Sequence, residues 1–387
     1  MGEDILDFLN HIIALGDVLL RSLSVLFVVM IIIFVHEAGH YLIGRWCGIK
    51  ASVFSLGFGP QIVGYTDRRG TQWRLALIPL GGYVKFIGDE EGVHETSSRS
   101  LPIVDGSFAS AHAWKKAATV FAGPLFNALF TVVILTFFFF IYGRVAIEPV
   151  VGSFVKDFPA VQAGLQLGDR FIEIDGRQVE SFEDLMNYVT FHGENPIEFK
   201  MERGGQVFTT VITPKVVERD DGFGNRVRSG LIGVGVPVDP DNPARLDPAY
   251  VKHIRYGFGR ALREASKRVT FIVTQTIFFM GRLLGGKEDH CRLSGPSKTI
   301  KIAWQVSETG FISLLNFMAF FSIGVGLINL FPIPPLDGGH LLFHVVEIII
   351  GRPISVKIRE IIFRLGLCFV LLFMLFALFN DYFCWFS

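Results

Sequence analysis

Four apolar segments of this chain are each long enough to cross a lipid bilayer, which takes about 20 residues in a helix. They lie near Val18–Val35, Thr119–Tyr142, Phe311–Phe331 and Ile361–Phe379. Inside hydrocarbon a backbone must satisfy its own hydrogen bonds, so such segments fold as helices. Half of the 387 residues are hydrophobic and only 19% are charged, a balance typical of membrane proteins. We therefore expect a polytopic α-helical membrane protein with four transmembrane helices, embedded in the lipid bilayer.

A fifth apolar segment, Val269–Met280, is shorter than a crossing helix requires. Thr270, Thr274, Gln275 and Thr276 interrupt it with polar side chains. We interpret it as a helix that lies in the membrane interface rather than as a fifth span.

The distribution of basic residues predicts the side of the membrane that each loop faces. The first and third loops are rich in lysine and arginine, for example Arg68 and Arg69 in the first and Arg352 and Lys357 in the third. Both ends of the chain are acidic by comparison. The positive-inside rule therefore places these loops in the cytoplasm and the long segment 144–310 outside.

Two histidines four residues apart, His36 and His40, directly follow the first apolar segment, with Glu37 between them. On a helix, residues at this spacing project from the same face. The two imidazoles can share one Zn²⁺, and Glu37 can take a proton from an activated water. Ionisable residues at membrane depth are costly and are candidates for function. The alternative is a pair of interfacial histidines beside a glutamate that reaches toward water.

The third apolar segment ends in a proline-rich stretch, Asn329–His340. Prolines there break the helix and leave backbone carbonyls free, which near a membrane indicates a built site. Asp337 supplies the oxygen ligand that completes a catalytic site of two histidines and one carboxylate, with a fourth position for water. His340 is the alternative third ligand. With residues 144–310 outside, the first and third segments both end on the inner side, so the histidine pair and Asp337 meet there.

The first loop contains a predicted β-hairpin. Two β-prone runs, Gln61–Tyr65 and Thr71–Leu80, flank a polar turn, and the pair Gly81 and Gly82 ends the second run. The apolar side chains of the hairpin predict that it dips into the membrane edge. Irregular backbone at that depth survives only where it is buried in protein or lines a wet cavity.

The second apolar segment opens with Ala122, Gly123 and Pro124, followed by Asn127. Small residues there permit close packing between helices. An asparagine inside lipid requires a hydrogen-bond partner. Asn127 therefore makes either a structural bond between helices or a contact within a functional site.

From Glu148 the composition changes to that of a soluble α/β module. The pattern predicts strands at Val150–Val155 and Phe171–Ile174, a helix at Ser181–Thr190 with Ser181 as its N-cap, and two further strands. This order, with the turn-rich stretch Ala163–Arg170, resembles a PDZ domain of the bacterial protease type. Such domains bind extended peptide tails by strand addition.

Taken together, the motifs resemble those of the site-2 proteases, the intramembrane zinc metalloproteases, and in particular the regulator-of-sigma-E branch of Gram-negative bacteria. The matching motifs run in the family's order along nearly the whole chain: His36-Glu37-x-x-His40, Gly123-Pro124-x-x-Asn127, Leu293-Ser294-Gly295-Pro296 and Asn329-x-x-Pro332-x-Pro334-x-Leu336-Asp337-Gly338. One departure is clear: well-known members of that branch carry two tandem PDZ domains, whereas only one can be identified here.

The resemblance implies one Zn²⁺ per chain on His36, His40 and Asp337, with Glu37 as the catalytic base. Asn329 is implied as a helper that positions substrate or stabilises the oxyanion. The hairpin resembles the family's membrane-dipping element that pairs with the substrate. The substrate contacts that we expect are at Gly81, Gly82, Asn127, Pro332 and Pro334.

The expected organisation has four parts. Residues 1–147 form the first half of the membrane core, 148–240 the PDZ domain (core 150–214), 241–310 a linker with an interfacial amphipathic helix, and 311–387 the second half of the core. The resemblance implies the bacterial inner membrane, a periplasmic PDZ domain and an active site toward the cytoplasm. Implied substrates are single-pass membrane proteins, such as a trimmed anti-sigma factor or signal-peptide remnants.

The PDZ domain would either gate substrates by size or recruit them by their tails. Deleting residues 150–214 separates these roles: a lost gate makes untrimmed substrates cleavable, whereas a lost recruiter lowers all cleavage. Other functions fit less well. A non-proteolytic zinc scaffold does not need Glu37. A metal transporter would carry ionisable residues along several spans, whereas here they lie at one depth. A PDZ adaptor with a membrane anchor leaves Asp337 unexplained. The formal net charge of zero gives no reason to expect nucleic acid as a partner.

Overall fold

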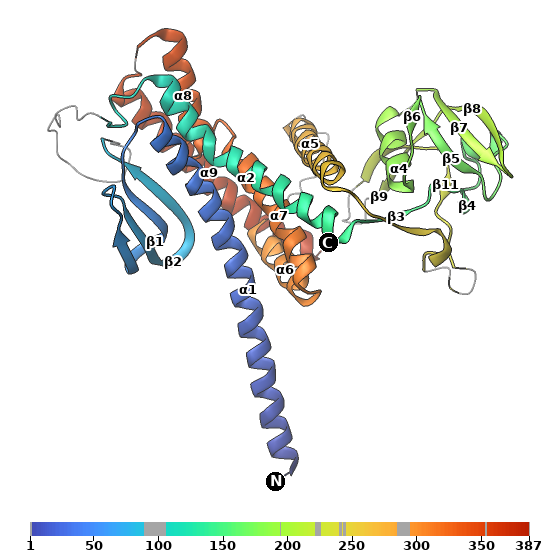
Figure 1. Cartoon of the computed structure of the whole chain (residues 1–387), viewed down its shortest axis with the longest axis horizontal. Coiled ribbons are helices and arrows are strands. Elements are labelled where there is room, and N and C mark those ends of the chain that lie inside the picture. Colours follow the sequence, from blue (N-terminus) through green and yellow to red (C-terminus); the bar gives the residue numbers. More distant parts are fainter. Residues whose placement is uncertain are drawn as a thin grey trace. The chain divides into compact units, whose positions relative to one another are not determined.

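The computed structural model describes residues 2–88, 106–193, 195–220, 226–239, 242, 245–284, 295–352 and 354–386. The chain divides into two compact units (Figure 1). The first, the membrane unit, comprises residues 1–136, 262–278 and 293–387. The second, the module unit, comprises residues 137–261 and 279–292. Helices dominate the membrane unit, and strands dominate the module unit.

Four helices in the described part of the chain are long and apolar enough to cross a membrane, which confirms the predicted fold class. They are α1 (Gly2–Trp46), α2 (Ala113–Tyr142), α7 (Phe311–Asn329) and α9 (Val356–Phe386). Helix α1 does not end at Val35 but continues through His40, so the histidine pair lies within a helix, as its spacing requires.

Three further helices are α5 (Phe258–Leu284), α6 (Pro296–Glu308) and α8 (Asp337–Ile350). Helix α5 contains the predicted interfacial segment and is not one of the four candidate spans found among the described residues. The start of α6 is capped from α9: the Asp381 carboxylate accepts hydrogen bonds from the amides of Gly295 (2.8 Å) and Lys298 (3.2 Å). Leu293 and Ser294, which precede this start, lie outside the described residues.

Helices α1 and α2 pack closely through glycine. A Cβ atom on Gly39 would lie 2.5 Å from the carbonyl oxygen of Ala122, so any larger residue would force the helices apart. This agrees with the close packing predicted from the small residues of α2. Deeper in the unit, Val28 and Ile32 of α1 pack with Met318 of α7 in a small apolar cluster.

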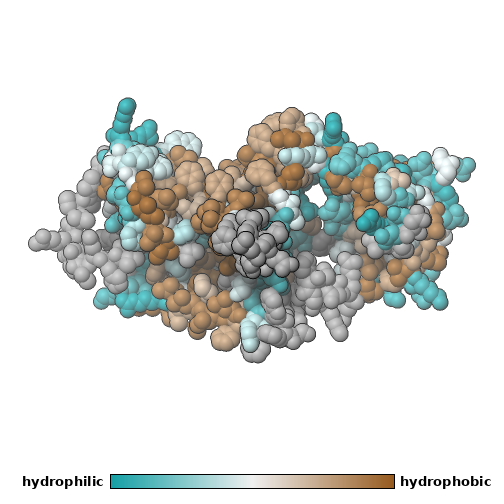
Figure 2. Space-filling model, turned by 90° about the horizontal axis from the view of Figure 1, so that it is seen from below, coloured by the Kyte–Doolittle hydropathy of each residue, from teal (hydrophilic) through white to brown (hydrophobic). Residues whose placement is uncertain are grey.

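Many apolar side chains of the membrane unit face outward. Phe27 on α1, Ile328 on α7, and Leu365 and Phe379 on α9 are all more than half exposed. Figure 2 shows brown, apolar residues on the face seen from below. An apolar surface of this extent is unfavourable in water and is covered by lipid in a membrane protein. The lipid bilayer is therefore a partner of this chain.

The predicted hairpin is present but longer than expected: β1 (Ala51–Thr66) pairs antiparallel with β2 (Gln72–Phe86). The prediction that β2 ends at Gly81 and Gly82 is wrong. Gly81 adopts a positive φ of 101°, and beyond it the chain turns back onto β1. Ser55 consequently pairs with both Arg74 and Tyr83, and residues 82–86 form an outer strand.

The module unit contains a four-stranded sheet in the order β6-β5-β7-β8. Its strands are β5 (Arg170–Ile174), β6 (Arg177–Gln178), β7 (Ile197–Arg203) and β8 (Gln206–Ile212). Helix α4 (Phe182–His192) begins at Ser181, whose hydroxyl accepts a hydrogen bond from the amide of Asp184, as predicted. Phe171, Leu185 and Phe199 are fully buried in the core between the sheet and the helix.

The first predicted strand of the module is shorter than expected. Only β4 (Ser153–Phe154) is regular, and it pairs with β11 (Val234–Gly235). Pro237 packs tightly against the residue before this strand, since a Cβ on Gly152 would lie 2.1 Å from its nitrogen. The strands β9 (Lys215–Asp220) and β10 (Arg226–Leu231) form an additional antiparallel pair that the sequence pattern did not reveal.

The ends of the module unit meet in a short antiparallel pair. Strand β3 (Arg144–Ile147) follows α2, and β12 (Val251–Ile254) pairs with it. A short helix, α3 (Pro159–Gln162), and a 3-10 turn, η1 (Pro248–Tyr250), complete the described elements. The compact unit is therefore longer than the PDZ module 148–240, because the chain pairs with itself before and after that module.

Candidate active site

Helix α1 brings His36, Glu37 and His40 together in the interior of the membrane unit. All three side chains are buried. The Nε2 atoms of the two histidines lie 3.2 Å apart, and their rings meet edge to face. Their spacing places them one turn apart on the same face of the helix, as predicted.

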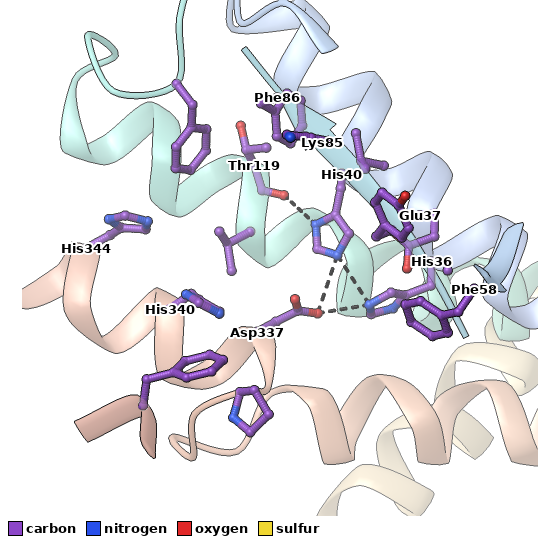
Figure 3. Close-up of a pocket in the computed structure, with 17 residues that line it drawn as sticks. His36, Glu37, His40, Phe58, Lys85, Phe86, Thr119, Asp337, His340 and His344 are labelled. Carbon is purple, nitrogen blue, oxygen red and sulfur yellow. Dashed lines mark hydrogen bonds and ion pairs between the residues drawn. The ribbon is translucent and has the colours of Figure 1, made fainter. Parts of the chain in front are cut away.

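The first residue of α8, Asp337, faces this histidine pair (Figure 3). Its Oδ2 atom lies 2.9 Å from His36 Nε2 and 3.4 Å from His40 Nε2. The stretch that ends α7 and begins α8 turns sharply to present this carboxylate. A Cβ on Gly338 would lie 2.1 Å from the carbonyl oxygen of Phe331, which shows how tightly that turn is packed. Residues about 300 positions apart in the sequence thus share one site.

These three side chains fit the donor set of a catalytic zinc site. They form the group of candidate metal ligands found within the described residues, with all ligand atoms within 4.8 Å of one another. Tetrahedral ligands about 2.0–2.1 Å from zinc lie roughly 3.3 Å apart, close to the separations observed here. The buried Oδ2 atom of Asp337 faces the Nε2 atoms of both histidines, so one cation could contact all three atoms at once.

Backbone and side-chain groups of α2 contact the histidines from behind. His40 Nδ1 lies 2.9 Å from the carbonyl oxygen of Thr119, and His36 Nδ1 lies 3.3 Å from the side-chain amide of Asn127. Between them is Gly123, where a Cβ would lie 2.3 Å from His40 Nε2 and 2.8 Å from His36 Cε1. The site therefore depends on a bare backbone at position 123.

The site opens into a cavity of about 580 Å³. One wall consists of the consecutive residues 82–86 of β2, and another contains Phe108, His340 and His344. A Cβ on Gly82 would lie 3.0 Å from Glu37 Cγ, so the strand runs directly beside this glutamate. The cavity thus has an extended backbone segment next to an acid–base group and a candidate metal site.

Comparison with known proteins agrees with this geometry. The sequence model described as "Peptidase family M50" matches residues 24–373. The chain belongs to peptidase family M50. This is the site-2 protease family, so the resemblance inferred from the motifs is confirmed at the level of the family; the regulator-of-sigma-E branch stays a prediction.

Several relatives align with this M50 protease over most of their length. A candidate zinc metalloprotease of Bartonella henselae is 93% identical over 358 residues, covering 92% of this chain and all of the relative. A candidate zinc metalloprotease of Brucella suis is 44% identical, covering 92% of this chain and 94% of the relative. Metalloprotease MmpA of Caulobacter vibrioides is 32% identical, covering 94% of this chain and 95% of the relative.

Among solved structures, the PDZ domain of an SdrC-like protein of Listeria monocytogenes is 24% identical and covers 24% of this M50 protease and 90% of that domain. At a TM-score of 0.19, this likeness carries no weight of its own. The PDZ-like character of the module rests on the strand order and capped helix described above.

The remaining predicted site residues of the protease occupy different positions. Within the described residues, the cavity lining includes Gly82 but not Gly81, Asn329, Pro332 or Pro334. Asn329 is the last residue of α7 and is half-buried, Pro332 is exposed, and Pro334 is buried. Their predicted contacts with substrate stay predictions.

Asn127 lies away from the cavity, fully buried against His36. His340 lines the cavity but is not part of the group of candidate ligands, which contains Asp337 instead. The preference for Asp337 over His340 therefore agrees with the geometry.

Sequence reasoning missed two features of the site. The contact of Thr119 with His40 uses a backbone carbonyl, for which no residue-type signal exists. The second is a buried ion pair at the end of α8, where Glu347 lies 3.2 Å from His344 Nδ1 and 3.1 Å from Arg359. Burial raises the pKa of the Glu347 carboxyl, but hydrogen bonds from His344 and from the Ile354 amide outweigh burial and hold that pKa below its ordinary value.

Proposed function

We propose that this chain is an intramembrane zinc metalloprotease that hydrolyses peptide bonds within or beside the transmembrane segments of single-pass membrane proteins. Zn²⁺ is its cofactor, held by His36, His40 and Asp337. The observation that carries the proposal is the convergence of these three ligand atoms beside Glu37 in a cavity built from apolar helices.

The chemistry follows from the positions of the side chains. When bound, zinc supplies a Lewis acid that activates a water molecule for attack at neutral pH. Glu37 accepts the proton that this water loses as it attacks the scissile carbonyl carbon. Glu37 then passes the proton to the amide nitrogen as the carbon–nitrogen bond breaks, which gives an amine and a carboxylic acid. The acid loses its own proton at neutral pH and becomes a carboxylate.

The outer strand 82–86 supports a role in holding substrate. A peptide bond in a transmembrane helix is internally hydrogen-bonded, so the substrate must unwind before cleavage. Pairing with the outer strand would replace the lost backbone hydrogen bonds by strand addition. Gly82 of this strand lies directly beside Glu37, and we assign the substrate contact to this part of the hairpin.

Asp337→Ala tests the proposed ligand set. We expect loss of zinc from the purified chain together with loss of proteolysis, because only two imidazoles would remain. Zinc content, measured by atomic absorption on the variant in detergent, separates this outcome from a purely catalytic defect. His340→Ala is the matched control and should keep its zinc. Unchanged zinc in Asp337→Ala, with loss in His340→Ala, would assign the third ligand to His340 instead.

We further propose that the protein lies in the inner membrane with the PDZ domain in the periplasm and the active site toward the cytoplasm. Cysteines placed at two exposed positions test this arrangement in a background without native cysteines. Arg69→Cys, in the turn of the hairpin, should be protected from an impermeant thiol reagent in intact cells. Gln206→Cys, in the module, should react once the outer membrane is permeabilised. The reverse labelling pattern would overturn the orientation.

We infer the substrate class, single-pass membrane proteins, from the family resemblance. A trimmed anti-sigma factor or a signal-peptide remnant presents one transmembrane segment with little mass outside, and a PDZ groove could bind its extended tail. Quantitative membrane proteomics of cells with the normal enzyme and with Glu37→Gln tests this class. Single-pass proteins and remnants should accumulate in the variant, and unchanged levels of all of them would refute the assignment.

A further inference from the structure

Each histidine of the site has its second ring nitrogen against α2. The partner of His40 Nδ1 is the carbonyl oxygen of Thr119, at 2.9 Å. A carbonyl can only accept, so His40 Nδ1 must carry the ring proton of the neutral imidazole. Its Nε2 then offers a lone pair toward Asp337. Thr119 thereby fixes His40 in the form that binds a metal.

The partner of His36 Nδ1 is the side-chain amide of Asn127, at 3.3 Å from Nδ2. Asn127 is fully buried, and its Oδ1 atom has no hydrogen-bond partner in the described structure. Leaving a buried oxygen unpaired is unfavourable, because it loses its hydrogen bonds to water without gaining others. With Nδ2 of Asn127 toward the ring, the amide donates to Nδ1, which must then be unprotonated. The ring proton of His36 would therefore be on Nε2 and point into the ligand cluster.

Rotating the amide by 180° pairs the buried oxygen and moves the ring proton of His36 out of the ligand cluster, while Nδ2 takes the position that Oδ1 held. The two orientations of an asparagine amide have nearly the same shape, so hydrogen bonding decides which one is preferred. With Oδ1 toward His36, the buried oxygen accepts the Nδ1 proton, and Nε2 presents its lone pair beside those of His40 and Asp337. We therefore propose that Asn127 is a positioning residue that holds His36 in its metal-binding tautomer and orientation.

The backbone of Asn127 is itself fixed by its own helix and by α7. Its carbonyl oxygen accepts hydrogen bonds from the hydroxyls of Thr131 on α2 (2.9 Å) and Ser322 on α7 (3.2 Å). A Cβ on Gly326 of α7 would lie 3.2 Å from Asn127 Cβ. The backbone and Cβ of Asn127 are thus fixed by contacts within α2 and from α7, which keeps the side chain against His36. A substrate in the cavity cannot reach it without moving this histidine, so the inference replaces the predicted substrate contact.

The test measures zinc affinity of the full-length chain in detergent by competition with a chromophoric chelator. Asn127→Leu keeps the volume and removes the acceptor. We expect its dissociation constant for zinc to rise 10–100-fold, the usual cost of losing such a partner. Asn127→Asp keeps an acceptor but no donor, so its affinity should equal or exceed that of the normal chain. Loss of affinity in Asn127→Asp would show that the amide donates, and would overturn the inference.

A matched control separates positioning from helix packing. Thr136→Val removes a buried hydrogen bond of the same helix, from the Thr136 hydroxyl to the Val132 carbonyl oxygen (2.7 Å), at a position that neither His36 nor Asn127 uses, and its zinc affinity should be unchanged. In Co²⁺-loaded protein, the visible absorption bands should shift in Asn127→Leu and not in Thr136→Val. Should Asn127→Leu fail to fold, Asn127→Asp still decides the matter, because it loses zinc affinity only if the amide acts as a donor.

The inference rests on the proposed ligand set, and the two can fail separately. His36→Ala should lose zinc if His36 is a ligand. Normal zinc affinity in His36→Ala would refute the ligand set. Loss of zinc in His36→Ala with normal affinity in Asn127→Leu would refute only the role of Asn127.

Discussion

Glu37→Gln should abolish proteolysis while the protein keeps its zinc. The amide cannot accept the proton that the attacking water releases, and loss of a general base costs about 10²–10⁴-fold in rate. The ligand atoms of His36, His40 and Asp337 are untouched by the change, so zinc content should be unaltered. Cleavage of a transmembrane peptide by the purified variant, with zinc measured on the same sample, checks both parts of the prediction.

Two comparisons make this result informative. Glu360→Gln is the matched control, because it makes the same chemical change on an exposed part of α9 and should retain normal cleavage. A Glu37→Gln variant that cleaves at a near-normal rate would exclude Glu37 as the base. A variant that loses zinc as well would indicate that the buried carboxylate supports the ligands rather than the chemistry.

Gly123→Ala should disrupt the metal site although it adds only one methyl group. The new Cβ would lie 2.3 Å from His40 Nε2 and 2.8 Å from His36 Cε1, where real contacts do not occur. Either α2 must retreat or the two imidazoles must turn. Misplacing reacting groups by about 1 Å can cost on the order of 10²-fold in activity, and we expect zinc affinity to fall with it. Overpacking should also destabilise the fold by about 1–3 kcal/mol.

Gly324→Ala provides the control for Gly123→Ala. It is also a glycine within a membrane helix, but a Cβ there would meet nothing within 4 Å. Zinc affinity and cleavage should be normal in Gly324→Ala and strongly reduced in Gly123→Ala. Equal behaviour of the two variants would mean that the contact between α2 and the histidines does not constrain the site.

Much of the membrane core follows from local patterns in the sequence. Long apolar runs predict the four helices, because a single chain segment in hydrocarbon can satisfy its own backbone hydrogen bonds only as a helix. The spacing of His36 and His40 predicts a shared helix face, and the prolines before Asp337 predict a turn that could carry a ligand. These patterns depend only on neighbouring residues and their chemistry, so they can be interpreted without the tertiary structure.

Other features depend on contacts that a residue pattern does not encode. The hairpin was expected to end at Gly81, because glycine commonly ends strands. Here its positive φ instead turns the chain back to make a further strand. The support of His40 comes from a backbone carbonyl, and the pairing of β3 with β12 joins segments about 100 residues apart. Tertiary packing determines each of these three features, and a local sequence pattern does not predict tertiary packing.

The outer strand 82–86 has a consequence for how such an enzyme would choose its cutting point. Strand addition reads main-chain groups, which every residue offers alike, rather than particular side chains. Selectivity would then lie in how readily a segment gives up its helix. A glycine lowers that cost by about 1 kcal/mol relative to alanine. The cleaved bond would therefore be marked by weak helix formers. Replacing these with alanine or leucine would protect a substrate, although the main-chain groups that pair with the enzyme stay the same.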